Sequence, residues 1–169
     1  MQFSAILEKS DSPLWGHYIS VPDVVAQVFI SEGTKRVVCT LANTLVFQCA
    51  LMPKGDGTYF ININKKRQEE TGLKPGMSIQ VALKKDDSKY GLPMPEELAE
   101  LLKMDEEGNR LFHALMPGKQ RNLLYIAGQP KTSDARIKRA IVCMEHLKAN
   151  DGKIVFKRLN EEMREANKL

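Results

Sequence analysis

Two short runs of alternating apolar residues, joined by a turn-prone tripeptide, constrain the fold of this chain most strongly. Apolar residues fall at every second position in residues 37–41 and again in residues 45–51. The tripeptide between the runs, residues 42–44, is Ala-Asn-Thr. A period of two is the spacing of side chains on one face of a strand. The sequence therefore predicts an antiparallel β-hairpin over residues 36–52.

Further strand patterns surround this hairpin. They lie at residues 2–7, 15–21, 58–64 and 79–83. Helical spacing at residues 23–33 and 65–71, ended in each case near a glycine, predicts two brief helices. Six short strands with brief helices predict an α+β fold, whose first domain, residues 1–88, is a small antiparallel β-barrel, closed or half-closed.

A polar stretch at residues 84–92 predicts a linker, and residues 93–150 predict a short helical segment. Four amphipathic helices are expected there, each punctuated by Pro, Gly or a capping residue. The last begins near residues 132–134. One face of it carries Ile137, Ala140, Ile141, Met144 and Leu147, and the opposite face carries Arg136, Lys138, Arg139 and His146. Residues 151–169 predict a polar tail with weak helical character.

The formal net charge of +4 is distributed unevenly. Residues 1–92 contribute +2, residues 93–108 contribute −5, and residues 109–169 contribute +7. A basic surface of this kind suits a polyanionic or acidic partner, although a solvated surface is the alternative reading.

The three cysteines, Cys39, Cys49 and Cys143, are odd in number and lie among apolar neighbours. This pattern predicts reduced, buried thiols rather than a disulfide framework or a zinc knuckle. No run approaches the roughly 20 apolar residues of a membrane helix, and the first residues do not resemble a secretory signal. We therefore expect a soluble, cytoplasmic protein with no membrane contact.

Motifs that carry catalysis are missing from the sequence. The glycines stand singly at expected turns, so no phosphate-binding loop is predicted. The three histidines are far apart, so no metal site is predicted, and neither a serine elbow nor a cysteine–histidine pattern is present. The sequence thus predicts no cofactor, no metal and no catalytic residue.

Two places in the first domain are candidate ligand sites. Trp15 and His17 share one face of an expected strand and could stand side by side at a barrel mouth, with a packed rim tryptophan as the alternative. Lys65 and Arg67 directly follow a strand and could hold an anion at the start of a short helix. The alternative there is charge compensation by the two glutamates that follow.

The strongest basic set lies in the helical segment. Lys119, Arg121, Arg136 and Arg139, with the nearby Lys131 and Lys138, could form one positive surface that neutralises phosphates or binds an anion. Stacking aromatics are sparse there, so a platform for single-stranded nucleic acid is poorly supported.

Several motifs resemble known bacterial families. The N-terminal part resembles the family called domain of unknown function 1905, which implies a split β-barrel. Its matching motifs are Phe3-Ser4-Ala5, Val21-Pro22, the hairpin at 36–52, residues 57–65 and Gly72-Leu73-Lys74-Pro75-Gly76. The C-terminal part resembles the YdeI/OmpD-associated family, named for bacteriocin protection. The motifs there are Met116-Pro117-Gly118-Lys119-Gln120-Arg121, Lys131-Thr132 and Arg136-Ile137. Neither resemblance implies a catalytic residue.

Three hypotheses of function follow. The first is a non-enzymatic binding or stress-associated accessory protein that holds an acidic protein, a small anion or a nucleic acid. The second is a small-molecule enzyme at the barrel mouth, with His17 as proton carrier and Lys65 or Arg67 holding an anionic group. The third makes the barrel a dimerisation module, so that the protein is a homodimer.

Overall fold

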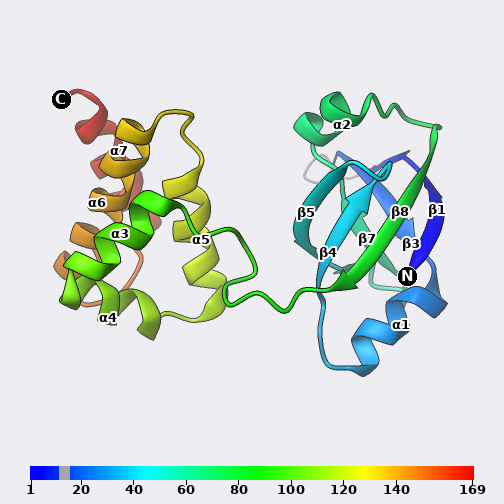
Figure 1. Cartoon of the computed structure of the whole chain (residues 1–169), viewed down its shortest axis with the longest axis horizontal. Coiled ribbons are helices and arrows are strands. Elements are labelled where there is room, and N and C mark those ends of the chain that lie inside the picture. The colour runs from blue at the N-terminus through cyan, green and yellow to red at the C-terminus, as the bar shows by residue number, and fades with distance from the viewer. Residues whose placement is uncertain (12–15) are drawn as a thin grey trace. The chain divides into compact units, whose positions relative to one another are not determined.

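The computed structural model describes residues 1–11 and 16–169, which divide into two compact units, Met1–Asp87 and Ser88–Leu169 (Figure 1). Within the part of the chain that it describes, no helix is long and apolar enough to cross a membrane.

The first unit contains two four-stranded antiparallel sheets. The first sheet has the order β1-β8-β4-β5 and the second has the order β2-β3-β7-β6. The strands of the first are β1 (Gln2–Ile6), β8 (Ser78–Lys85), β4 (Arg36–Leu41) and β5 (Leu45–Ala50). Those of the second are β2 (Glu8–Lys9), β3 (His17–Val21), β7 (Tyr59–Asn62) and β6 (Met52–Pro53).

The predicted hairpin is confirmed as the β4–β5 pair, in which Cys39 stands opposite Phe47. Its turn contains Ala42 and Asn43, with φ values of 52° and 59°. Two consecutive left-handed residues match the twist of the flanking strands, which is why this tripeptide closes a tight hairpin.

The prediction of a barrel is wrong, because the two sheets are not closed into one. The chain passes from one sheet to the other at Leu7, between β1 and β2, and at Leu51, between β5 and β6. At each of these corners the strand in the second sheet has only two residues. Pro53 in β6 has no N–H to extend its ladder. The corners also explain why there are eight strands where six were expected, because each corner adds a two-residue strand.

Two helices, α1 (Asp23–Ser31) and α2 (Lys65–Thr71), complete the first unit. Its core gathers apolar side chains from both sheets and from α1. Fully buried members are Leu7, Ile19, Ala26, Val37, Cys39, Leu41, Leu51, Ile61 and Ile63.

The second unit is built from five helices. They are α3 (Glu96–Met104), α4 (Glu106–Ala114), α5 (Pro117–Gly128), α6 (Ser133–Ala149) and α7 (Phe156–Asn167). The long helix α6 contacts each of the other four. The core around it contains Leu98, Phe112, Leu123, Met144 and Leu147.

The helical part is therefore not short, contrary to the expectation, and it extends into the segment expected as a polar tail. Leu159 on α7 is completely buried, and Ile154 and Met163 pack beside it. Leu159 and Met163 are four residues apart, about one helical turn, so they give α7 one apolar side, and Ile154 lies just before the helix. His146, expected on the polar face of α6, is also buried, because α7 packs against that face at His146.

A candidate binding trough between α3 and α6

Helix α3 supplies one wall of the candidate site. Glu96 and Glu97 occupy its first turn, where the positive end of the helix dipole favours carboxylates. Leu98 and Leu102 are buried in the core, which fixes the orientation of the helix. Next to this buried face, α3 carries Leu101 and Met104, and Met104 is 78% exposed.

Helix α6 supplies the other wall. It begins at the capping residue Thr132, whose hydroxyl accepts a hydrogen bond of 3.2 Å from the backbone N–H of Ala135. Its inner face is buried in the core of the unit. Ile137 and Ile141 lie one turn apart on its flank, and they are 43% and 45% exposed.

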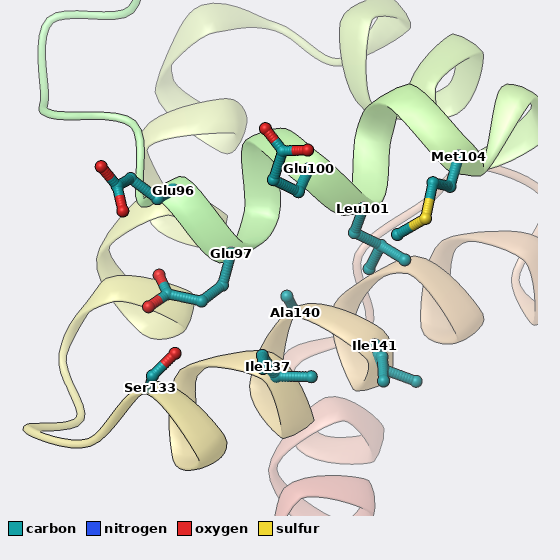
Figure 2. A pocket seen from close by; sticks show the side chains of 9 residues that line it. All are labelled: Glu96, Glu97, Glu100, Leu101, Met104, Ser133, Ile137, Ala140 and Ile141. Atoms are coloured by element: carbon teal, nitrogen blue, oxygen red, sulfur yellow. The ribbon is translucent and has the colours of Figure 1, made fainter.

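Between these walls lies a hollow of about 370 Å³, which we call the α3–α6 trough. Figure 2 shows α3 and α6 side by side, with the first turns of both helices at the same end. The lining residues are Glu96, Glu97, Glu100, Leu101, Met104, Ser133, Ile137, Ala140 and Ile141. One end of the trough is therefore acidic and polar, and the other end is apolar.

A guanidinium group ties the acidic end together. Arg136 Nε lies 2.8 Å from Glu97 Oε1, and its Nη1 donates to the carbonyl oxygens of Pro130 and Lys131, each at 3.0 Å. Hydrogen bonds from its own backbone N–H, from Arg136 and from the Ser133 hydroxyl lower the pKa of the Glu97 carboxyl. Glu97 is thus held ionised against a cation of the same unit.

The other two carboxylates of the trough face solvent. Glu100 forms an exposed ion pair of 2.8 Å with Lys103 on the same helix, and Glu96 is exposed in the first turn of α3. Exposed pairs of this kind are weak and exchange easily with other cations. The acidic end therefore offers carboxylates to a positively charged group.

The cysteine thiols of both units are weak nucleophiles. Burial raises the pKa of the Cys143 thiol, and that of Cys49 in the first unit, to about 12. It raises the pKa of Cys39 further still. Since the thiolate is the reactive form, these cysteines are structural. Among the described residues there is also no group of three or more metal-ligating side chains.

His146 resembles half of a catalytic pair but has a structural role. Its Nδ1 lies 2.8 Å from Glu162 Oε2, and its Nε2 accepts a hydrogen bond of 3.0 Å from the backbone N–H of Val155. This pattern assigns the proton to Nδ1. Both ring nitrogens are thus used to join α6 to α7, one at the middle of α7 and one at the residue that precedes it.

A second hollow, of about 480 Å³, lies in the first unit. It is lined by Ser4, Ala5, Ile6, Glu8, Ser20, Val21, Pro22 and Ser78. The hydroxyl of Ser20 already donates to Glu8 and accepts from Lys54, at 3.0 and 2.8 Å. Neither hollow is lined by His17, Lys65 or Arg67.

The structure places the candidate residues of the first unit as follows. The carbonyl of His17 accepts from the N–H of Ile63, so His17 lies near the start of α2 and hence near Lys65. The guanidinium of Arg67 lies 3.8 Å from the centre of the Phe47 ring. The N-terminal end of α2 is capped by the Asn64 side chain, which accepts from the Arg67 N–H. Trp15 lies outside the described residues.

The basic candidates of the second unit are spread along α5 and α6. Lys119, in the first turn of α5, has its ammonium 4.9 Å from the centre of the Phe156 ring, and Arg121 follows on the same helix. Arg139 donates instead to the carbonyl of Ile126, near the other end of α5. Residues 119 and 126 are about 10 Å apart along the axis of α5, so the Lys119 ammonium and the Arg139 guanidinium are not adjacent. Arg136 belongs to the trough.

The sequence did not single out the lining of the trough. It placed Ile137 and Ile141 on one apolar face of the last helix, and the glutamates of α3 entered only through the −5 charge of residues 93–108. Two signals pointed to the trough. The apolar stripe of α6 is wider than the core can cover, and the −5 charge of residues 93–108 is concentrated next to it.

Two family models match the chain. Residues 3–83 match the domain of unknown function 1905, and residues 92–150 match the family described as Bacteriocin-protection, YdeI or OmpD-Associated. Both resemblances predicted from the motifs are thereby confirmed, in the same order along the chain. No curated protein matches the chain. All nine residues of the trough lie within the second match.

Proposed function

From these two matches and the α3–α6 trough, we propose that the chain is a non-enzymatic accessory protein that holds a cationic, partly apolar partner in the trough. The observation that carries this proposal is the exposure of Ile137 and Ile141 beside three carboxylates. Exposed apolar patches with a polar rim are typical of interaction sites.

A binding role is also supported by the environments of the Cys143 thiol and the His146 imidazole in the second unit. The Cys143 thiol has a raised pKa, and His146 uses both ring nitrogens to join helices. The description of the second matched family names bacteriocin protection, which suits an accessory role.

A matched pair of small amphiphiles tests the proposal. Octylammonium and octanoate each contain eight carbon atoms and carry opposite charges. With 13C-labelled isoleucine methyl groups, octylammonium should shift the Ile137 and Ile141 signals at lower concentration than octanoate does, and should leave buried Ile19 and Ile61 unchanged. The same affinity for both amphiphiles, or no shift of either isoleucine, would overturn the proposal.

An acidic partner or small anion is a second candidate, supported by the exposed ammonium groups of Lys131 and Lys138 and by the +7 charge of residues 109–169. Titration with duplex DNA, RNA and acidic peptides at two salt concentrations tests it. Phosphate contacts release counterions, so genuine binding must weaken steeply with salt. Absence of salt-sensitive binding to all three would remove this candidate.

A further inference from the structure

We propose that the partner in the α3–α6 trough is a basic amphipathic helix of another polypeptide, lying antiparallel to α3 and α6. This inference rests on the proposed function and adds the identity of the partner and its direction.

The openness of the trough favours a polypeptide over a small ligand. Small-molecule pockets bury about 70–90% of their ligand. Here Met104, Ile137 and Ile141 are 78%, 43% and 45% exposed, so the apolar lining is a surface strip and not an enclosed cavity. An elongated apolar object covers such a strip better than a compact one does.

The geometry of the walls suits a third helix. A groove between two packed helices receives the side-chain ridge of another helix at about 8–10 Å. From Glu97 to Met104 the wall rises about 10 Å, or two helical turns. A partner with apolar residues at positions i, i+4 and i+7 would therefore reach Leu101, Ile137 and Ile141 along one face.

Charge complementarity makes this partner basic. At the polar end of the trough, Glu97 is occupied by Arg136, whereas Glu96 is exposed and Glu100 is exposed in its surface pair with Lys103. Lysine or arginine at one end of the apolar face of the partner would reach the two exposed carboxylates.

The direction of the partner follows from the helix dipoles. The first turns of α3 and α6 lie at the acidic end of the trough (Figure 2), so the positive ends of both dipoles lie there. A partner that places its own C-terminal end there brings its negative end to them. Cations in its last turn then meet Glu96 and Glu100 and also suit its own dipole. If the partner lay parallel to α3 and α6, the interaction of its dipole with theirs would become unfavourable. The interaction of its cations with its own dipole would become unfavourable too.

Three synthetic peptides of equal length and composition, labelled for fluorescence anisotropy, test this inference. All carry leucines at i, i+4 and i+7. The first has its lysines in the last turn, and the second has them in the first turn. The third has the sequence of the first, except that its terminal proline and its central alanine have exchanged places. The first should bind about threefold more tightly than the second, because each dipole term is modest. It should bind at least about tenfold more tightly than the third, because an internal proline breaks the helix.

Variants locate the binding. Ile137→Ser with Ile141→Ser should reduce affinity for the first peptide about tenfold, from the loss of apolar area. Val24→Ser removes an exposed apolar side chain from α1 in the other unit and should have no effect. Equal binding of the first and third peptides, tighter binding of the second, or unchanged binding by the double variant would each overturn the inference.

The octylammonium titration distinguishes a failure of this inference from a failure of the proposed function on which it rests. If octylammonium shifts the Ile137 and Ile141 methyl signals but none of the peptides does, the helical partner is wrong and the proposal that the trough binds a cationic, partly apolar group remains. If neither probe shifts them, both proposals fail.

Discussion

Arg136 joins three segments of the helical unit through one side chain. It binds Glu97 on α3 and the carbonyl oxygens of Pro130 and Lys131 in the loop before α6. This contact fixes one end of the trough, and the carboxylate of Glu97 balances the positive charge of Arg136.

The lowered pKa of Glu97 predicts a specific pH dependence of stability. Because the carboxyl has a lower pKa in the folded chain, the unfolded chain binds the proton more readily as the pH falls. The contribution of Glu97 is therefore fully present above its ordinary value of 4.5 and is lost as the pH falls through the folded pKa. In Glu97→Gln this part of the pH dependence should disappear, as measured by urea midpoints of the helical unit from pH 3 to 6.

Glu161→Gln, at an exposed position on α7, controls for the loss of one acidic side chain. The same loss of stability on acidification in Glu97→Gln and in the unmodified chain would show that the Arg136 contact contributes nothing.

His146 should be among the most sensitive single positions. Its side chain is 1% exposed, and its removal would leave the backbone N–H of Val155 without its partner. His146→Ala should lower the free energy of unfolding of the helical unit by about 2–4 kcal/mol, through the cavity and the lost hydrogen bonds. Urea denaturation measures this, with His113→Ala at an exposed position for comparison. A loss no larger than that of His113→Ala would contradict the structural role.

At the scale of elements, the start of α4 depends on Gly108, which has no side chain. The Asp105 carboxylate accepts from the Gly108 N–H at 2.9 Å and from Lys148 at 2.8 Å. A Cβ at Gly108 would lie 2.6 Å from Asp105 Oδ2. The carboxylate would have to move, so both its capping bond and its ion pair would be disturbed.

Gly108→Ala should therefore destabilise the helical unit by about 1–3 kcal/mol, as capping losses and overpacking typically do. Gly118→Ala, on α5, is the matched variant, because its Cβ would meet nothing closer than 3.8 Å. That change should be neutral or stabilising by about 0.5 kcal/mol. Thermal unfolding of the two variants decides the matter, and equal effects would refute the explanation.

Local pattern predicted several elements well, and tertiary pairing explains where it failed. The β4–β5 hairpin followed from alternation and a turn, both local properties. The barrel did not follow, because closure depends on how Leu7 and Leu51 redirect the chain. Helix α7 was predicted only as a polar tail with weak helical character, because the burial of Leu159 depends on packing against α6.

At the scale of the whole molecule, each unit has its own core. Among residues 1–11 and 16–169, no buried residue is shared between the core of Met1–Asp87 and that of Ser88–Leu169. We expect fragments 1–87 and 88–169 to fold separately, and His146→Ala to lower the midpoint of the second unit alone. Circular dichroism of the two fragments checks this, and an unfolded fragment would contradict it.

The candidate site was the least predictable feature of the chain. Charge counting pointed to the basic residues beyond 108, but Arg136 and Arg139 are engaged with Glu97 and with the carbonyl of Ile126. The exposed hollow instead joins the acidic helix α3 to one flank of α6. Sequence spacing could place Ile137 and Ile141 on a face, but the number of helices that cover that face is a property of the fold.

The charge preference of the trough is the most direct test of this account. The measurement is the ratio of affinities for octylammonium and octanoate, before and after the double change Glu96→Lys and Glu100→Lys. Glu165→Lys is the matched control, because Glu165 pairs with Lys168 at 2.9 Å in the same way that Glu100 pairs with Lys103. The account predicts that the double variant reverses the preference, so that octanoate binds more tightly, while the control keeps it. An unchanged ratio in the double variant would contradict the account.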